Sequence, residues 1–146
     1  MKTYKDTFNI KTKGFSDILD ITRQVSAIVR NSGIEEGQVH VSVAGSTAAI
    51  TSIEFESGVV RDLNDAIERM APRNIKYYHD ARWGDGNGFA HVRAAMIGSF
   101  ATFALTEGKM FIGTWQQIVL IDFDNNPRNR SILVQIMGER NDEFRG

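Results

Sequence analysis

Segment 79–91, which reads HDARWGDGNGFAH, contains His79 and His91, two of the three histidines of the chain. Neutral imidazole binds zinc and similar divalent metals through nitrogen, and carboxylates, amides and water complete the coordination shell. Carboxylate and amide side chains of this kind lie between the histidines, namely Asp80, Asp85 and Asn87. Gly84, Gly86 and Gly88 lie beside them and allow a tight turn. The segment predicts a pocket for a metal ion or a phosphate. The alternative is an ordinary polar loop, because so wide a spacing fixes no geometry.

Arg128 and Arg130 are the second candidate group, since they have the same parity where a strand is predicted to begin. Side chains of equal parity point to one face, and guanidinium groups bind phosphate oxygens as forks, so both could face one anion. Arg82 and Arg93, near the histidines, are equal candidates for a phosphate. In the alternative, Arg128 and Arg130 pair with surface carboxylates, namely Asp122, Asp124 or Glu139.

The elements before the histidines are predicted as strand, helix, strand and helix. Alternation of apolar residues predicts strands around 4–10 and 39–43, and the latter makes His40 a solvated or hydrogen-bonded structural histidine. A helix capped by Ser16 is expected to carry one apolar stripe and to stop at 31–33. That stripe comprises Ile18, Ile21, Val25, Ile28 and Val29. A second helix is predicted over 59–71, before Pro72.

After the histidine loop the sequence predicts a meander of strands. Apolar runs at 94–105, 109–123 and 131–139 are separated by turn residues at 107–108 and 124–129. Early helices and late strands together predict an α+β fold, with an antiparallel-rich sheet in layers and two or three packed helices. Trp115 is expected to pack as core.

Composition restricts the classes of protein. The 146 residues fit one domain, 1–146, and a net charge of -1 gives no basic field for nucleic acid. No apolar run is long enough to span a bilayer, and the amino terminus lacks the apolar stretch of a secretory signal. Zero cysteines exclude disulfides and thiol chemistry. We therefore expect a cytoplasmic protein without nucleic-acid or membrane partners.

Several motifs in order carry a family resemblance. They are GSTAAITSIE, RDLNDAIERMAP, YYHD with DGNGFAH, and EGKMFIGTWQQIVLIDFDNNPRNR, which together extend from about residue 10 to Glu139. This series resembles the YjbQ-like family, also called secondary thiamine-phosphate synthases. GKMFIGTWQ, ending at Gln116, is its most specific part.

The resemblance implies a compact α+β homotrimer with a histidine pocket near subunit contacts. It also implies a weak transferase reaction that joins a pyrimidine-methyl pyrophosphate to a thiazole phosphate and releases pyrophosphate. The implied cofactor is a divalent metal, zinc or magnesium, and the implied ligand is a small phosphorylated molecule. The residues that match catalytic, metal-binding or phosphate-binding positions are His79, His91, Glu54, Asp85, Asn87, Thr114, Gln116, Arg128 and Arg130.

The chain departs from the family pattern at Gly45, where a third histidine is expected. A catalytic zinc site needs three protein ligands and an open position. The remaining ligands, His79 and His91, therefore predict a weak metal site or none, unless Glu54, Asp85 or water replaces the third.

Three functions follow as hypotheses. The first is the weak transferase, in which Glu54 orients an imidazole and Thr114 and Gln116 line the pocket. A solvated Glu54 and interface packing of Thr114 and Gln116 are the alternatives. The second is a trimeric small-molecule or anion-binding protein without catalysis, suggested by Gly45. The third is a purely structural assembly protein.

Overall fold

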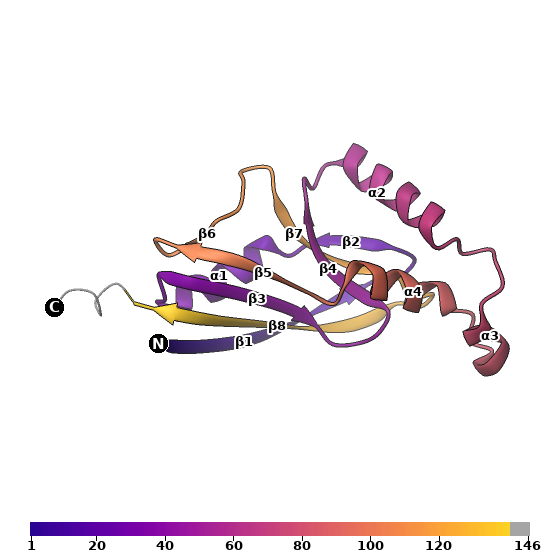
Figure 1. Cartoon of the computed structure of the whole chain (residues 1–146), viewed down its shortest axis with the longest axis horizontal. Helices are drawn as coiled ribbons and strands as arrows, with labels where there is room; N and C mark the ends of the chain where they lie inside the picture. The colour runs from indigo at the N-terminus through magenta and orange to yellow at the C-terminus, as the bar shows by residue number, and fades with distance from the viewer. Residues whose placement is uncertain (141–146) are drawn as a thin grey trace.

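The computed structural model describes residues 1–140, which form two antiparallel sheets and four helices (Figure 1). This confirms the predicted α+β fold. In spatial order, the five-stranded sheet consists of β1 (Lys2–Thr12), β8 (Arg128–Glu139), β3 (Glu36–Val43), β5 (Phe100–Thr106) and β6 (Lys109–Met110). The three-stranded sheet consists of β2 (Asp17–Asp20), β7 (Gln117–Asp122) and β4 (Ala48–Ile53). The helices are α1 (Thr22–Ser32), α2 (Ser57–Met70), α3 (Tyr78–Trp83) and α4 (Gly88–Ile97).

Strand β7 lies at the centre of the three-stranded sheet and contributes to two hydrophobic cores. Ile118 and Leu120 point into one core, whereas Val119 and Ile121 point into the other. Successive side chains of a strand alternate between faces, so an apolar residue at every position fits a strand covered on both sides. The run IVLI is therefore what this central position requires.

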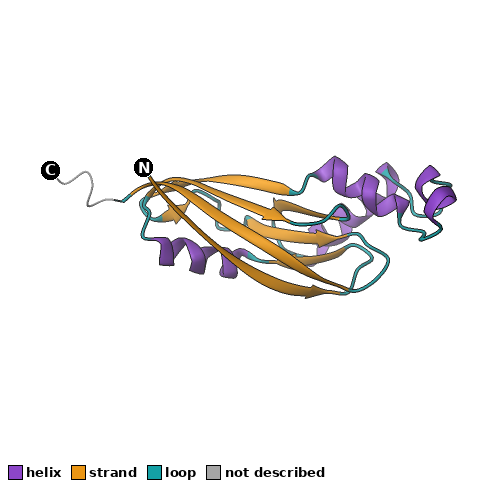
Figure 2. Ribbon diagram, turned by 90° about the horizontal axis from the view of Figure 1, so that it is seen from below, coloured by secondary structure: helices purple, strands orange, loops and turns teal. Residues whose placement is uncertain are grey.

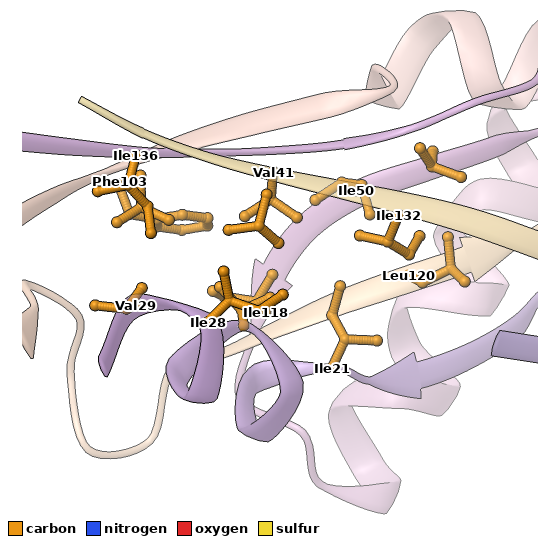
Figure 3. Close-up of a cluster of buried hydrophobic side chains, with 14 of the residues drawn as sticks. Ile21, Ile28, Val29, Val41, Ile50, Phe103, Ile118, Leu120, Ile132 and Ile136 are labelled. Atoms are coloured by element: carbon orange, nitrogen blue, oxygen red, sulfur yellow. The ribbon is translucent and has the colours of Figure 1, made fainter. Parts of the chain in front are cut away.

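The first core lies between the five-stranded sheet and a layer made of α1 and β7. Figure 3 shows Val41, Phe103 and Ile136 of the sheet facing Ile28 of α1 and Ile118 of β7. The predicted strand residues Tyr4, Phe8 and Ile10 pack against this core from β1. Helix α1 thus covers one face of the larger sheet.

The second core lies on the other face of β7, beneath α2 and α4. Ile67 of α2 and Phe89 of α4 are buried against Phe123, just after β7. Helix α2 begins where Glu56 accepts hydrogen bonds from the N–H groups of Gly58 and Val59, which hold the pKa of its carboxyl below its ordinary value. Helices α2, α3 and α4 consequently gather at one end of the elongated molecule, and the amino terminus lies at the other (Figures 1 and 2).

The predicted helix capped by Ser16 is wrong in its first turn. Residues 17–20 form strand β2, and Ser16 has a positive φ of 63°. Helix α1 begins at Thr22, whose N–H is accepted by Oδ1 of Asp20 at 2.9 Å. Pairing of Ile18 with Ile121 on β7 outweighs the helical spacing of the stripe.

The predicted loop at 79–91 is also corrected, because both histidines lie on helices. His79 belongs to α3 and His91 to α4, and only the turn 84–87 between them is non-helical. Gly84 ends α3 in the left-handed conformation, with φ 73°. The predicted strand run from residue 94 likewise begins only at Phe100, because 94–97 complete α4. Within residues 1–140, no helix has the length and apolar character needed to cross a membrane.

We predict that Leu120→Ala destabilises the protein by about 2–5 kcal/mol, because it opens a cavity beside a fully buried central strand. Leu133→Ala on β8 is the matched control, since Leu133 is only partly buried. Urea unfolding followed by circular dichroism measures both variants. Equal losses of unfolding free energy would contradict the placement of β7 between two cores.

Candidate functional site

The two histidines are brought together by the hairpin of α3 and α4. Oδ1 of Asp80 on α3 accepts a hydrogen bond from the N–H of Gly88 at 2.8 Å and so ties the start of α4 to α3. The rings of His79 and His91 then lie with their centroids 4.4 Å apart and their planes inclined by 39°. The imidazoles of the predicted pocket thus converge within one chain.

His79 also faces two carboxylates. Its Nδ1 lies 3.2 Å from Oδ1 of Asp80 and 3.3 Å from Oδ1 of Asp85. One ligand atom from each of these three residues lies within 4.8 Å of the others. One imidazole nitrogen and two carboxylate oxygens suit a divalent ion such as zinc. This donor set includes Asp80, for which the sequence pattern predicts no specific role, and His91 lies beside it.

His91 is not part of this donor set and instead lines a cavity of about 370 Å³. Segment 45–48 forms the facing wall, with Gly45, Ser46 and Ala48. Small-molecule sites span roughly 300–1,000 Å³, so this cavity fits one small ligand. The remaining wall is contributed by α4 and the start of β5: Ala94, Ala95, Gly98, Ser99 and Phe100.

Behind this cavity lies a buried ion pair between Arg130 of β8 and Asp122 of β7. The guanidinium grips the carboxylate as a fork, with Nε to Oδ2 and Nη2 to Oδ1 both at 2.7 Å. Nη2 also donates to Oγ1 of Thr47 at 2.7 Å, and Thr12 of β1 donates to Asp122 Oδ2 at 2.6 Å. Asp122 is fully buried and Arg130 is 8% exposed. The predicted anion ligand Arg130 is thus largely engaged within the protein.

A second buried carboxylate, Asp124, extends this network to the histidine hairpin. Arg128 donates from Nε to its Oδ2 at 2.9 Å, and Asn87 donates from Nδ2 to its Oδ1 at 3.2 Å. Asn125 donates to the backbone oxygen of Asp85 at 2.9 Å. The predicted ligands Asn87 and Asp85 are therefore held against the turn that follows β7. The buried Oδ1 of Asn87 has no hydrogen-bond partner among residues 1–140.

The network sets the ionisation of Asp124. Burial by itself raises the pKa of this carboxyl, but four hydrogen bonds outweigh burial and bring the pKa below its ordinary value. The donors are Asn87, Arg128, the backbone N–H of Asn125, and Thr47. Asp124 is therefore a carboxylate at neutral pH and balances the charge of Arg128.

Gly45 occupies a position where a side chain would collide with the guanidinium of Arg130. Its φ is +120°, which L residues rarely adopt, and a Cβ there would lie 2.7 Å from Nη1 of Arg130. A histidine at this position would have to displace the guanidinium held by Asp122. The missing third histidine and the position of Arg130 are thus physically linked.

Glu54, Thr114 and Gln116 lie elsewhere. Strand β4 separates Glu54 from segment 45–48, and its six residues at about 3.3 Å each span roughly 20 Å. At that far end, Gln116 donates to Oγ of Ser52 at 3.0 Å and Gln117 accepts from the N–H of Phe55. The structure therefore gathers these predicted residues apart from the histidines.

Trp115 is exposed over 74% of its surface, so its predicted core position is wrong. It lies in loop 111–116, outside strand pairing, and Phe111 in the same loop is 79% exposed. The apolar pattern of the run 109–123 concealed this loop, because only the part from Gln117 onward is strand β7.

The anchoring roles of Asp80, Asp122 and Asp124 were missed at the sequence level. A signal for two of them exists, since acidic residues two apart directly follow the buried run IVLI. Carboxylates at the end of a buried strand require partners, and the nearest cations are Arg128 and Arg130. The structure therefore contains the alternative predicted for these arginines, because Arg128 pairs with Asp124 and Arg130 pairs with Asp122. Both carboxylates are buried, whereas the alternative expected them at the surface.

We predict that Asp124→Asn lowers stability most at neutral pH. Because the folded pKa of Asp124 is depressed, its contribution is complete above the unfolded pKa of about 3.9 and is lost as pH falls through the folded value. The stability difference between the unmodified protein and the variant should therefore shrink below about pH 4. Urea unfolding between pH 3 and 7 measures it, with Asp65→Asn on exposed α2 as control. A pH-independent difference would contradict the ionised network.

This chain is similar to known proteins both in sequence and in structure. The family model described as UPF0047 protein YjbQ-like matches residues 6–139. A UPF0047 protein of Methanothermobacter thermautotrophicus is 34% identical over 139 residues, 95% of each chain. A YbjQ-like protein of unknown function from Sulfolobus solfataricus has a TM-score of 0.89 and 37% identity, covering 94% of this chain and 99% of that one. A YjbQ/UPF0047 family protein from Clostridium acetobutylicum has a TM-score of 0.82 and 32% identity, covering 90% and 99%. The chain belongs to the YjbQ-like UPF0047 family.

Proposed function

We propose that the cavity beside His91 binds a phosphorylated small molecule and supports a weak transferase reaction of the thiamine-phosphate synthase type. The observation that carries this proposal is the ring contact between His79 and His91, at 4.4 Å between centroids, where His91 lines a cavity of about 370 Å³. Paired imidazoles beside a ligand-sized cavity provide both proton transfer near neutral pH and hydrogen bonds to phosphate oxygens.

In the proposed reaction the ring nitrogen of a thiazole phosphate attacks the methylene carbon of a pyrimidine-methyl pyrophosphate. A carbon–nitrogen bond forms, the carbon–oxygen bond breaks, and pyrophosphate leaves with the electron pair. The task of the protein is to position the two reactants and to stabilise the departing charge. His91 donates a hydrogen bond to the leaving oxygen, and the contacts of His79 with Asp80 and Asp85 hold the His79 ring beside His91.

A divalent ion, zinc or magnesium, fits the set of His79, Asp80 and Asp85 better than the two histidines alone. When bound, it would supply positive charge for the leaving pyrophosphate. Asp80 already receives the N–H of Gly88, which fixes its oxygen beside His79. The protein residues thereby hold their ligand atoms in place through α3 and α4.

A homotrimer would supply what one chain lacks at this site. Glu54, Thr114 and Gln116 lie at the far end of β4, and the cavity is near the lower limit of ligand sites. Loop 111–116 presents Phe111 and Trp115 to solvent, and exposed large apolar residues mark interaction surfaces. We infer that this loop packs on a neighbouring copy.

The second candidate is a small-molecule or anion-binding protein without catalysis. Gly45 favours it, because the wall of the cavity opposite His91 then contributes no third imidazole. Such a protein would bind a small molecule or an anion in the cavity without converting it to product.

We predict that the protein forms thiamine phosphate slowly from the two substrates and that a His79→Ala, His91→Ala double variant loses about 100-fold or more of this activity. Chromatography of the product measures turnover, and elemental analysis of the same samples measures zinc and magnesium. His40→Ala is the control, since His40 lies on β3 and bonds Thr102.

Activity that survives in the double variant would exclude the histidine pair as the catalytic group. Tight phosphate-ligand binding without product in the unmodified protein would establish the second candidate.

We predict that the unmodified protein has three times the 16.3 kDa chain mass in solution. A Phe111→Ser, Trp115→Ser double variant should dissociate, because it removes the exposed apolar loop surface. Light scattering after size-exclusion chromatography measures the mass. Ile75→Ser, at a residue 54% exposed between α2 and α3, is the control. An unchanged mass in the double variant would place the contact elsewhere.

A further inference from the structure

A second cavity, of about 240 Å³, is lined by residues of α2, of α4 and of two connecting segments. Phe89 and Arg93 of α4 line it, whereas His91 and Ala95 of the same helix line the cavity described above. Because successive residues of an α-helix are about 100° apart, residues two positions apart point in nearly opposite directions. Within residues 1–140, the two cavities therefore share no lining residue and lie on opposite sides of α4.

The turn before β2 holds an aromatic ring at this second cavity. Gly14, Phe15 and Ser16 have positive φ angles of 77°, 56° and 63°. Such a backbone is strained for a bulky residue and persists only where its neighbours hold it. Here the N–H of Phe15 donates to the backbone oxygen of Asp124 at 2.6 Å, and Oγ of Ser16 accepts from Nη1 of Arg93 at 3.0 Å. As a result, the Phe15 ring lines the cavity and stays 50% exposed.

Two phenylalanine rings and two guanidinium groups form walls of the second cavity. The guanidinium carbon of Arg73 lies 4.5 Å from the ring centroid of Phe15 and 5.7 Å from that of Phe89. The guanidinium carbon of Arg93 lies 5.0 Å from the Phe89 centroid. Aromatic faces and guanidinium planes both stack against flat aromatic ligands. These walls therefore favour a flat aromatic ligand.

The charges of the second cavity favour a neutral ligand. Nε of Arg93, which the sequence made a phosphate candidate, donates to the backbone oxygen of Ala71 at 3.0 Å, and its Nη2 pairs with Glu68. The backbone N–H of Arg73 and the Arg93 side chain hold the pKa of the Glu68 carboxyl below its ordinary value, so it is a carboxylate at neutral pH. This carboxylate opposes an anionic ligand, and the guanidinium of Arg73 opposes a cationic one.

Asn64 supplies an unsatisfied hydrogen-bonding group to the second cavity. It lines the cavity from α2, and its Oδ1 is buried without a hydrogen-bond partner in the described part of the chain. Buried polar atoms are almost always partnered, so this acceptor requires an explanation. Asn64 as a whole is only partly buried, so its amide can turn toward a ligand. An amide offers an acceptor beside a donor, and an amine beside a ring nitrogen, as in adenine, matches both.

We propose that the second cavity is a binding site for a neutral aminopurine, separate from the site of the proposed function. The purine stacks against Phe15 and Phe89, and its amine and adjacent ring nitrogen pair with the amide of Asn64. A volume of about 240 Å³ is below the roughly 300–1,000 Å³ of drug-sized sites, so it suits a single base. A purine covers more of the two phenylalanine rings than a one-ring pyrimidine does.

Equilibrium dialysis of the full chain with adenine, purine and cytosine tests the proposal. Adenine should bind saturably, at one molecule per chain. Purine has the same rings without the amine and should bind about tenfold more weakly, because the Asn64 oxygen then stays unpaired. Cytosine has the amine on one ring and should bind about fivefold more weakly, because it stacks over less area. Equal binding of purine and adenine, or no saturable binding of adenine, would overturn the proposal.

Variants of the cavity wall test the two contacts separately. Asn64→Leu keeps the size of the side chain and should weaken adenine binding about tenfold. Asn74→Leu is the matched control, at an exposed asparagine just after α2 and outside the described lining. Phe15→Leu should weaken binding about fivefold by removing the stacking ring. Because Phe15 is half exposed, this variant decides the matter if Asn64→Leu does not fold. Adenine affinity equal to that of the control in either variant would contradict the site.

The His79→Ala, His91→Ala double variant distinguishes the two cavities. Its adenine affinity should be unchanged, because the described wall of the second cavity contains neither histidine. A loss of affinity would place adenine beside His91 and overturn the proposal. Formation of thiamine phosphate is a separate readout, so either proposal can fail while the other stands.

Adenosine, dialysed in parallel, identifies the source of the purine. An affinity equal to that of adenine would indicate a nucleoside, whose ribose lies outside the cavity. A marked loss on addition of the ribose would indicate the free base. Both results support an aminopurine site, whereas binding of adenosine that is unaffected by Asn64→Leu and by Phe15→Leu would exclude this cavity.

Discussion

The buried pair of Asp122 and Arg130 is the constraint on which the site end of the molecule depends. Asp122 ends the central strand of the smaller sheet, and Arg130 lies on β8 of the larger one, so their fork joins the two sheets. Such a pair costs desolvation, and removal of one partner typically destabilises a protein by about 3–5 kcal/mol, because the other charge stays buried. Thr12 and Thr47 satisfy the remaining lone pairs and donors, which makes the arrangement tolerable.

The histidine hairpin takes its position from the same network. Helix α3 has six residues, too few to persist alone in water, since isolated helices shorter than about 12–15 residues are marginal. Its stability comes from contacts that bind the turn 84–87 to the residues after β7, through Asn87 to Asp124 and Asn125 to Asp85. The geometry of His79 and His91 is therefore a consequence of the buried charges, although neither histidine touches them. A rigid supporting network of this kind is what a preorganised site requires.

Sequence patterns predicted a helix or a strand correctly wherever the apolar residues followed a single spacing, either strand alternation or helical spacing. The alternation at 39–43 and the helical spacing of Leu63 and Ile67 correspond to β3 and α2. These patterns were misleading at Ile18, because an apolar residue of the edge strand β2 has the spacing of a helical stripe. They were also misleading at 84–88, because the glycines that end α3 and begin α4 are typical of a loop. Motif order singled out candidate residues but did not predict the distances between them. Glu54 and His91 are equally motif residues, yet the length of β4 sets Glu54 far from segment 45–48, and no local pattern encodes that separation.

The contact between position 45 and Arg130 links the absence of a histidine at position 45 to the buried fork with Asp122. A side chain at position 45 and the present fork of Arg130 compete for the same space, because the Cβ of that side chain would lie 2.7 Å from Nη1. A third imidazole there would require the guanidinium to move away from Asp122, and the buried carboxylate would lose its partner. With glycine at position 45, the fork is kept, and Gly45 itself lines the cavity. The imidazole and carboxylate atoms of His79, Asp80 and Asp85 lie close together on the hairpin, whereas Gly45 and Ser46 lie on the cavity wall. His91 lies between these two groups, in ring contact with His79 and on the cavity wall.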